Sequence, residues 1–119
     1  MHHGMVTCGP DDPLRDVAST MANHRVHAVM IIDRPRGRPL GVVHDEDVIA
    51  AIARGDEDAV ARDATRGEPP TVSSGASVRT AARLMSQHHV SHLVVVEGAS
   101  GYPAGVVSTL DVASVYASR

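Results

Sequence analysis

Two stretches of the chain share one pattern: PLGVVHDEDVIAA at residues 39–51 and PAGVVSTLDVASV at residues 103–115. In each stretch, a glycine is followed by a short apolar run, a polar turn with an aspartate, and a helical pattern. The aspartates, Asp47 and Asp111, lie 111 − 47 = 64 positions apart, and the glycines are also related by 105 − 41 = 64. The second stretch therefore reads as a copy of the first.

The same offset continues through the chain without a gap. It relates the following identical pairs: Thr7/Thr71, Arg15/Arg79, Ala18/Ala82, Met21/Met85, His24/His88, Val26/Val90, Gly37/Gly101 and Pro39/Pro103. Apolar runs predict strands at 6–8, 28–33 and 40–44 and again at 71–73, 93–97 and 104–108, with helices from 14, 45, 78 and 109. Each copy thus predicts a β-α-β-β-α unit.

The predicted fold class is α/β (α+β), with two tandem units in one module. We expect units at residues 1–55 and 65–119, with a partly helical linker at 56–64. A unit of this size buries too little apolar surface to be stable alone. The two units are therefore expected to pack through their sheets with pseudo-two-fold symmetry.

The composition excludes several classes of function. The chain of 119 residues has no Phe or Trp, only two Tyr, and a net charge of −3. Scattered arginines and few aromatic rings argue against nucleic-acid binding. No apolar run is long enough to span a membrane, and the single cysteine, Cys8, suits a reducing cytoplasm.

The residues resemble a known family, the tandem pair of CBS domains called the Bateman module. The resemblance covers essentially the whole chain. It rests on the doubled order of elements, on MANHRVHAVMIID and MSQHHVSHLVVVE, and on the signature glycine–apolar–apolar–Ser/Thr–x–x–Asp. GVVSTLD matches that signature fully, whereas GVVHDED has His44 in place of the hydroxyl residue.

The resemblance implies a regulatory sensor and not an enzyme. Such modules bind an adenosine-containing ligand (AMP, ADP, ATP, S-adenosylmethionine, NAD or a cyclic dinucleotide) in clefts between the paired domains. No cofactor is required, because the nucleotide is the regulatory ligand. The implied setting is energy sensing in a bacterial cytoplasm, as a disc-like homodimer that acts on an unknown effector protein. A ligand-free structural dimerisation module of the same fold is the alternative.

One cleft is preferred because its signature is intact. Ser108 and Asp111 can form a capping box, and that alone would explain them. The same helix N-terminus favours phosphate, while the aspartate can accept hydrogen bonds from both ribose hydroxyls. The resemblance adds residues of both repeats, so that the predicted set is Gly4, Val6, Val26, His27, Ala28, Ser91, His92, Ser108, Leu110 and Asp111.

The second cleft would use His44, Glu46, Asp47, Thr65, Pro70 and Val90, with Ser91 and His92. Asp45 and Glu46 add carboxylates, each of which costs about 0.5–1 kcal/mol near a phosphate across solvated distances. We therefore favour an ordinary acidic helix start here over a triphosphate site, and a less charged adenosine ligand stays open.

Catalysis and metal binding are not expected. The spacing of His24/His27 and of His89/His92 is H-x-x-H, but no further cysteine completes a zinc pattern. No nucleophile elbow, metal triad or Walker loop occurs in the sequence.

Overall fold

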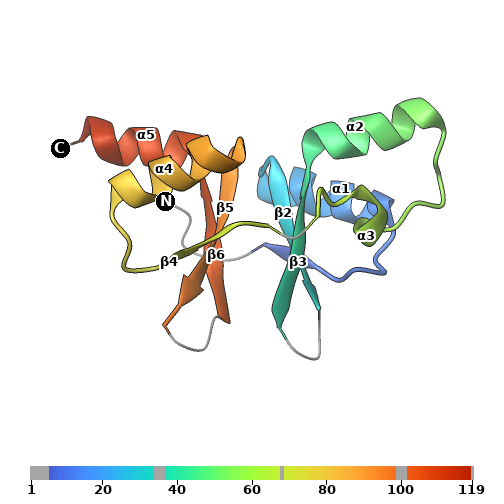
Figure 1. The fold of residues 1–119 in the computed structure, drawn as a ribbon. Coiled ribbons are helices and arrows are strands. Elements are labelled where there is room, and N and C mark those ends of the chain that lie inside the picture. The colour runs from blue at the N-terminus through green and yellow to red at the C-terminus, as the bar shows by residue number, and fades with distance from the viewer. Residues whose placement is uncertain (1–5, 34–36, 68, 99–101, 119) are drawn as a thin grey trace. The chain divides into compact units, whose positions relative to one another are not determined.

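In the computed structural model, residues 6–33, 37–67, 69–98 and 102–118 are described, and the chain divides into two compact units that separate at Pro69 and Pro70. The first unit, Val6–Pro69, contains β1 (Thr7–Cys8), α1 (Leu14–His24), β2 (Ala28–Asp33), β3 (Arg38–His44), α2 (Asp45–Arg54) and α3 (Ala61–Ala64). The second contains β4 (Thr71–Ser73), α4 (Val78–His88), β5 (His92–Glu97), β6 (Tyr102–Ser108) and α5 (Thr109–Ala117) (Figure 1). The predicted β-α-β-β-α order is confirmed in both.

Each unit has a three-stranded sheet with the same topology. β1 is parallel to β2, and β2 is antiparallel to β3; β4, β5 and β6 repeat this arrangement. Ala28 pairs with His44 in the first unit, and His92 pairs with Ser108 in the second. The start of the middle strand therefore lies beside the turn from the third strand into the following helix, α2 or α5, which brings both segments to one edge of each unit.

The first unit has an aliphatic core. Residues 29–32 of β2 are all buried, as expected for a strand covered on both faces. Leu14, Val17 and Met21 form the buried face of α1, at helical spacing. Ala59 and Ala61, which both lie in the predicted linker 56–64, are buried in the same core.

The second unit has a smaller core, formed by Val72, Ala81, Met85, Leu93 and Val107. No residue of α5 is buried, and its Leu110 and Tyr116 are 74% and 71% exposed. On α2, Ile49 and Ile52 are similarly exposed. α2 and α5 thus both carry large apolar side chains that are exposed.

The helix ends differ in how their backbone groups are satisfied. Ser77 caps α4, because its hydroxyl accepts a hydrogen bond from the Thr80 N–H at 3.1 Å. Asp12 makes no such cap on α1; its carboxylate accepts from the Gly9 N–H at 2.8 Å. α1 and α4 both end in left-handed residues that are not glycine, Arg25 and His89. Within the described ranges, no helix has the length and apolar character needed to cross a membrane.

Candidate functional site

The turn from β6 into α5 holds the two polar side chains of the intact signature. The Ser108 Oγ accepts a hydrogen bond from the Asp111 N–H at 3.1 Å, and the Asp111 Oδ2 accepts from the Ser108 N–H at 2.9 Å. This reciprocal pair is the capping box that the sequence predicted. Leu110, the other predicted residue of this turn, is exposed. The turn therefore presents a fixed hydroxyl and carboxylate at the N-terminus of a helix.

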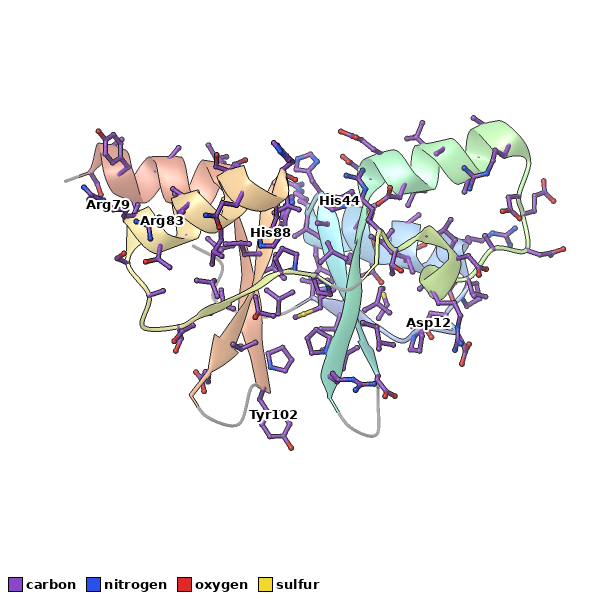
Figure 2. All side chains as sticks on the ribbon, viewed as in Figure 1. Asp12, His44, Arg79, Arg83, His88 and Tyr102 are labelled. Carbon is purple, nitrogen blue, oxygen red and sulfur yellow. The ribbon has the colours of Figure 1, made fainter. Side chains whose placement is uncertain are left out.

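The turn from β3 into α2 keeps the same backbone frame (His44 is labelled in Figure 2). The Asp47 Oδ2 accepts from the His44 N–H at 2.8 Å and lies 3.3 Å from the His44 Nδ1. The His44 side chain is 15% exposed and the Asp47 side chain is 16% exposed. An imidazole thus stands where the second repeat has a serine hydroxyl.

The start of each middle strand is tied to the turn beside it. The His27 carbonyl accepts from the Asp45 N–H, and the Ser91 carbonyl accepts from the Thr109 N–H, both at 2.9 Å. His27, Ala28 and the His44–Asp47 turn therefore lie together in the first unit. Ser91, His92 and the Ser108–Asp111 turn lie together in the second, where the Ser91 Oγ is 2.9 Å from the His92 Nδ1.

The remaining predicted residues contact the middle strands or the cores of their units. Val6 and Pro70 accept hydrogen bonds through their carbonyls from Met30 and Val94, each at 3.2 Å. Val26 and Val90 are partly buried against the cores of their own units. Gly4 lies outside the described residues. The assignment of these positions to one ligand or another stays a prediction.

Thr65 lies against the signature glycine of the first repeat. A Cβ added at Gly41 would be 2.6 Å from the Thr65 Cβ and 3.1 Å from the Gly67 carbonyl oxygen. A Cβ added at Gly105 would meet no described atom within 4 Å. By the 64-residue offset, the counterparts of 65–67 are residues 1–3, which are outside the described part of the chain. The space at Gly41 is therefore occupied by the segment 65–67.

Arg66 is a site residue that the sequence reasoning missed. Its Nε donates to the Asp47 Oδ1 at 3.0 Å, and its Nη2 lies 3.5 Å from the Glu46 Oε2. The hydrogen bond to Asp47 raises the pKa of the Arg66 guanidinium above its ordinary value. The only signal in the sequence was a cation directly after the predicted Thr65.

Three carboxylates make the first turn of α2 strongly acidic, whereas α5 begins with one. The Asp45 Oδ2 lies 2.9 Å from the His27 Nδ1 at the exposed surface. That hydrogen bond is the main reason that the pKa of Asp45 is lowered from 3.8. Among the described residues, no group of three or more His, Cys, Asp or Glu side chains is arranged to hold a metal ion.

Comparisons with known proteins place the chain among CBS domains. The family model described as CBS domain matches residues 1–54 and 61–118. The structure is similar to the CBS domain protein PAE2072 from Pyrobaculum aerophilum complexed with AMP, at 28% identity and TM-score 0.86, covering 100% of this chain and 95% of that chain.

Two further solved structures share the fold. The CBS-domain containing protein ATU1752 from Agrobacterium tumefaciens is 23% identical at TM-score 0.82, covering 96% of this chain and 90% of that one. The CBS domain pair of protein MJ0100, in complex with 5′-methylthioadenosine and S-adenosyl-L-methionine, is 18% identical at TM-score 0.87, covering 99% and 92%. A search of curated proteins gave no match.

Proposed function

Because the chain belongs to the CBS domain family, as a tandem pair of such domains, we propose that it is a regulatory module that binds an adenosine-containing ligand. The ligand classes are AMP, ADP, ATP, S-adenosylmethionine, NAD and cyclic dinucleotides. The module senses this ligand in the cytoplasm without catalysing a reaction or requiring a cofactor. Binding of the ligand acts in turn on a separate effector protein.

The observation that carries the proposal is the Ser108–Asp111 turn. Asp111 is fixed by the hydrogen bond from the Ser108 N–H, so its carboxylate can receive two ribose hydroxyls without losing rotamer freedom on binding. The helix N-terminus supplies a positive dipole end for a phosphate, and the Ser108 hydroxyl can donate to a phosphate oxygen. The AMP complex of the 28% identical Pyrobaculum protein supports the same ligand class.

The Asp111 turn is a better acceptor of an anionic ligand than the Asp47 turn. Asp45 and Glu46 stand at the start of α2, where α5 has the uncharged Thr109 and Leu110. A phosphate at the first turn would be repelled by both carboxylates. The resemblance also implies further contact residues around Asp111, such as Val6 and His92. These contacts stay predictions.

The experiment is calorimetric titration of the protein with AMP, ATP, NAD, S-adenosylmethionine and cyclic di-AMP. Asp111→Ala should abolish binding, while Asp47→Ala should change it little. The two variants are matched, because each removes the same carboxylate contact to the first residue of its turn. A ligand present at 100 times its Kd should also stabilise the wild type by about 2.7 kcal/mol. No binding of any adenosine ligand, or equal losses in both variants, would refute the proposal.

A second candidate, a structural dimerisation module, is favoured by the outer helix surfaces. A groove of about 580 Å³ lies between α4 and α5, lined mainly by Val78, Ala82, Met85, Val112 and Tyr116. A second groove, of about 310 Å³, lies between α1 and α2 and includes Val48 and Ile52. We propose a second copy of this chain as the occupant of these grooves.

The charges at the groove edges support a head-to-tail pairing of two copies. Arg79 borders the α4–α5 groove (Figure 2). Asp56 and Glu57 border the α1–α2 groove, beside one arginine, Arg15. Arg79 of one copy is therefore complementary to the acidic rim of the other copy.

Sedimentation velocity tests the dimer. The wild type should sediment as a dimer. Tyr116→Ser or Ile52→Ser should sediment as a monomer, and circular dichroism should show that this monomer is folded. Arg79→Glu should weaken the dimer, and adding Glu57→Arg should restore it. A monomeric wild type would refute the dimer, while a dimer that is insensitive to the charge changes would refute the head-to-tail pairing.

A further inference from the structure

We infer that Arg66 is a specificity-determining residue that closes the Asp47 turn to ribose, so that each chain takes one adenosine ligand. This inference rests on the proposed function, which assigns the ligand to the Asp111 turn. It goes further by giving the Asp47 turn a defined state, in which a side chain of the same unit takes the place of the ligand.

Both oxygens of Asp47 accept a hydrogen bond. Oδ2 receives the His44 N–H and faces the His44 Nδ1, and Oδ1 receives the Arg66 Nε. A ribose diol needs two acceptor positions on one carboxylate, and the guanidinium lies against the oxygen that has no backbone contact to the turn, where it takes an acceptor position and the space beside it. Because Asp47 is only 16% exposed, a ribose has to displace Arg66 to reach it.

Glu46 strengthens this closure. The Arg66 Nη2 lies 3.5 Å from the Glu46 Oε2, so one guanidinium spans two carboxylates of the same helical turn. The planar guanidinium suits such a two-point contact better than an ammonium group does. Displacing Arg66 would leave both carboxylates beside the ligand, which disfavours a phosphate most of all.

The backbone that carries Arg66 is itself held in place. Thr65 and Gly67 flank Arg66 and occupy the space at Gly41, and the Thr65 Oγ1 donates to the Arg62 carbonyl at 3.2 Å. A ligand therefore cannot use the close approach that a signature glycine otherwise allows. Two observations thus agree: the aspartate and the glycine of this repeat are both covered by residues 65–67.

The test uses the full chain with Asp111→Ala, which removes the carboxylate that is proposed to bind ribose at the other turn. This protein is titrated with adenosine and with AMP. Asp111→Ala alone should bind neither. Adding Arg66→Gln should open the Asp47 turn and tighten adenosine binding by about tenfold or more, with a smaller gain for AMP. Adding Asp47→Ala to that variant should remove the gain.

Arg62→Gln in the Asp111→Ala protein is the matched control. Arg62 is also an exposed arginine in an ion pair of the first unit, but its partner is Asp11 and not a carboxylate of the Asp47 turn. It should leave adenosine binding unchanged, and circular dichroism should show that every variant is folded.

Three results would overturn the inference: no gain from Arg66→Gln, the same gain from Arg62→Gln, or binding by Asp111→Ala alone that Arg66→Gln weakens. The last result would make Arg66 a ligand-binding cation. The proposed function fails separately, when the wild type binds no adenosine ligand. A wild type that binds through Asp111, combined with no gain from Arg66→Gln, refutes the inference alone.

Discussion

Gly41→Ala is expected to destabilise the first unit. The added methyl group at position 41 would lie 2.6 Å from the Thr65 Cβ, 2.8 Å from the Thr65 Cγ2 and 3.1 Å from the Gly67 carbonyl oxygen. All three atoms belong to residues 65–67, so the substitution tests the packing of that segment on β3.

The magnitude follows from which atoms the methyl group meets. Thr65 Cβ and the Gly67 carbonyl are close to or part of the main chain, so a rotamer change cannot relieve the overlap. Overpacking of this kind costs about 1–3 kcal/mol of unfolding free energy. Alanine also restricts the unfolded chain, which offsets about 0.4–1 kcal/mol of this cost. We therefore expect a net loss of about 1–2 kcal/mol.

The assay is urea unfolding followed by two signals. The chain has no Trp, and both tyrosines, Tyr102 and Tyr116, lie in the second unit, so tyrosine fluorescence reports that unit while circular dichroism reports both. Gly41→Ala should lower the midpoint of the first unit. Thr65→Gly added to it should recover part of the loss, since both threonine atoms in the overlap are removed. A Gly41→Ala variant as stable as the wild type, or the same loss whether residue 65 is threonine or glycine, would refute the packing of residues 65–67 on β3.

Two further predictions concern the turns. Ser108→Ala should lower the unfolding free energy of the second unit by about 1 kcal/mol, because the Asp111 N–H loses its acceptor. Tyrosine fluorescence during urea unfolding should show this loss. Ser114→Ala, on the same helix, is the control and should leave the urea midpoint unchanged. Asp45→Asn should lower stability slightly near neutral pH but not in acid. The folded-state pKa of Asp45 is depressed by His27, so its contribution is present above the unfolded value of about 3.9 and is lost as the pH falls through the folded pKa. Urea midpoints that differ from the wild type equally at all pH values would contradict this.

The fold was predictable because the repeat supplies every element twice. The β-α-β-β-α order and the Ser108–Asp111 capping box follow from local patterns that need no knowledge of distant contacts. The starts of the first helices of the two repeats were less predictable, because they differ although the repeats are aligned. In the structure, Asp12 accepts from the Gly9 N–H and leaves Pro13 at the N-cap position of α1, whereas Ser77 caps α4.

The site was predictable only in part. Arg66 contacts Asp47 across 19 positions of sequence, and nothing in the local pattern of residues 65–70 fixes the path of that segment. The contact of His27 with Asp45 depends on the register of β2 and β3, which a β-bulge between Ile31 and Ile32 shifts. Side-chain contacts that depend on such long-range geometry cannot be derived from spacing alone.

The left-handed residues at the ends of α1 and α4 are positions at which each unit could be stabilised. Arg25 and His89 have φ values of 53° and 54° at equivalent places, so each unit accepts about 1 kcal/mol or more of backbone strain at this turn. Glycine would relieve the strain but would also enlarge the unfolded ensemble, and at a positive φ the relief of strain is the larger effect. Each unit could therefore gain stability from a glycine beside the start of β2 or β5, without altering the path of the backbone.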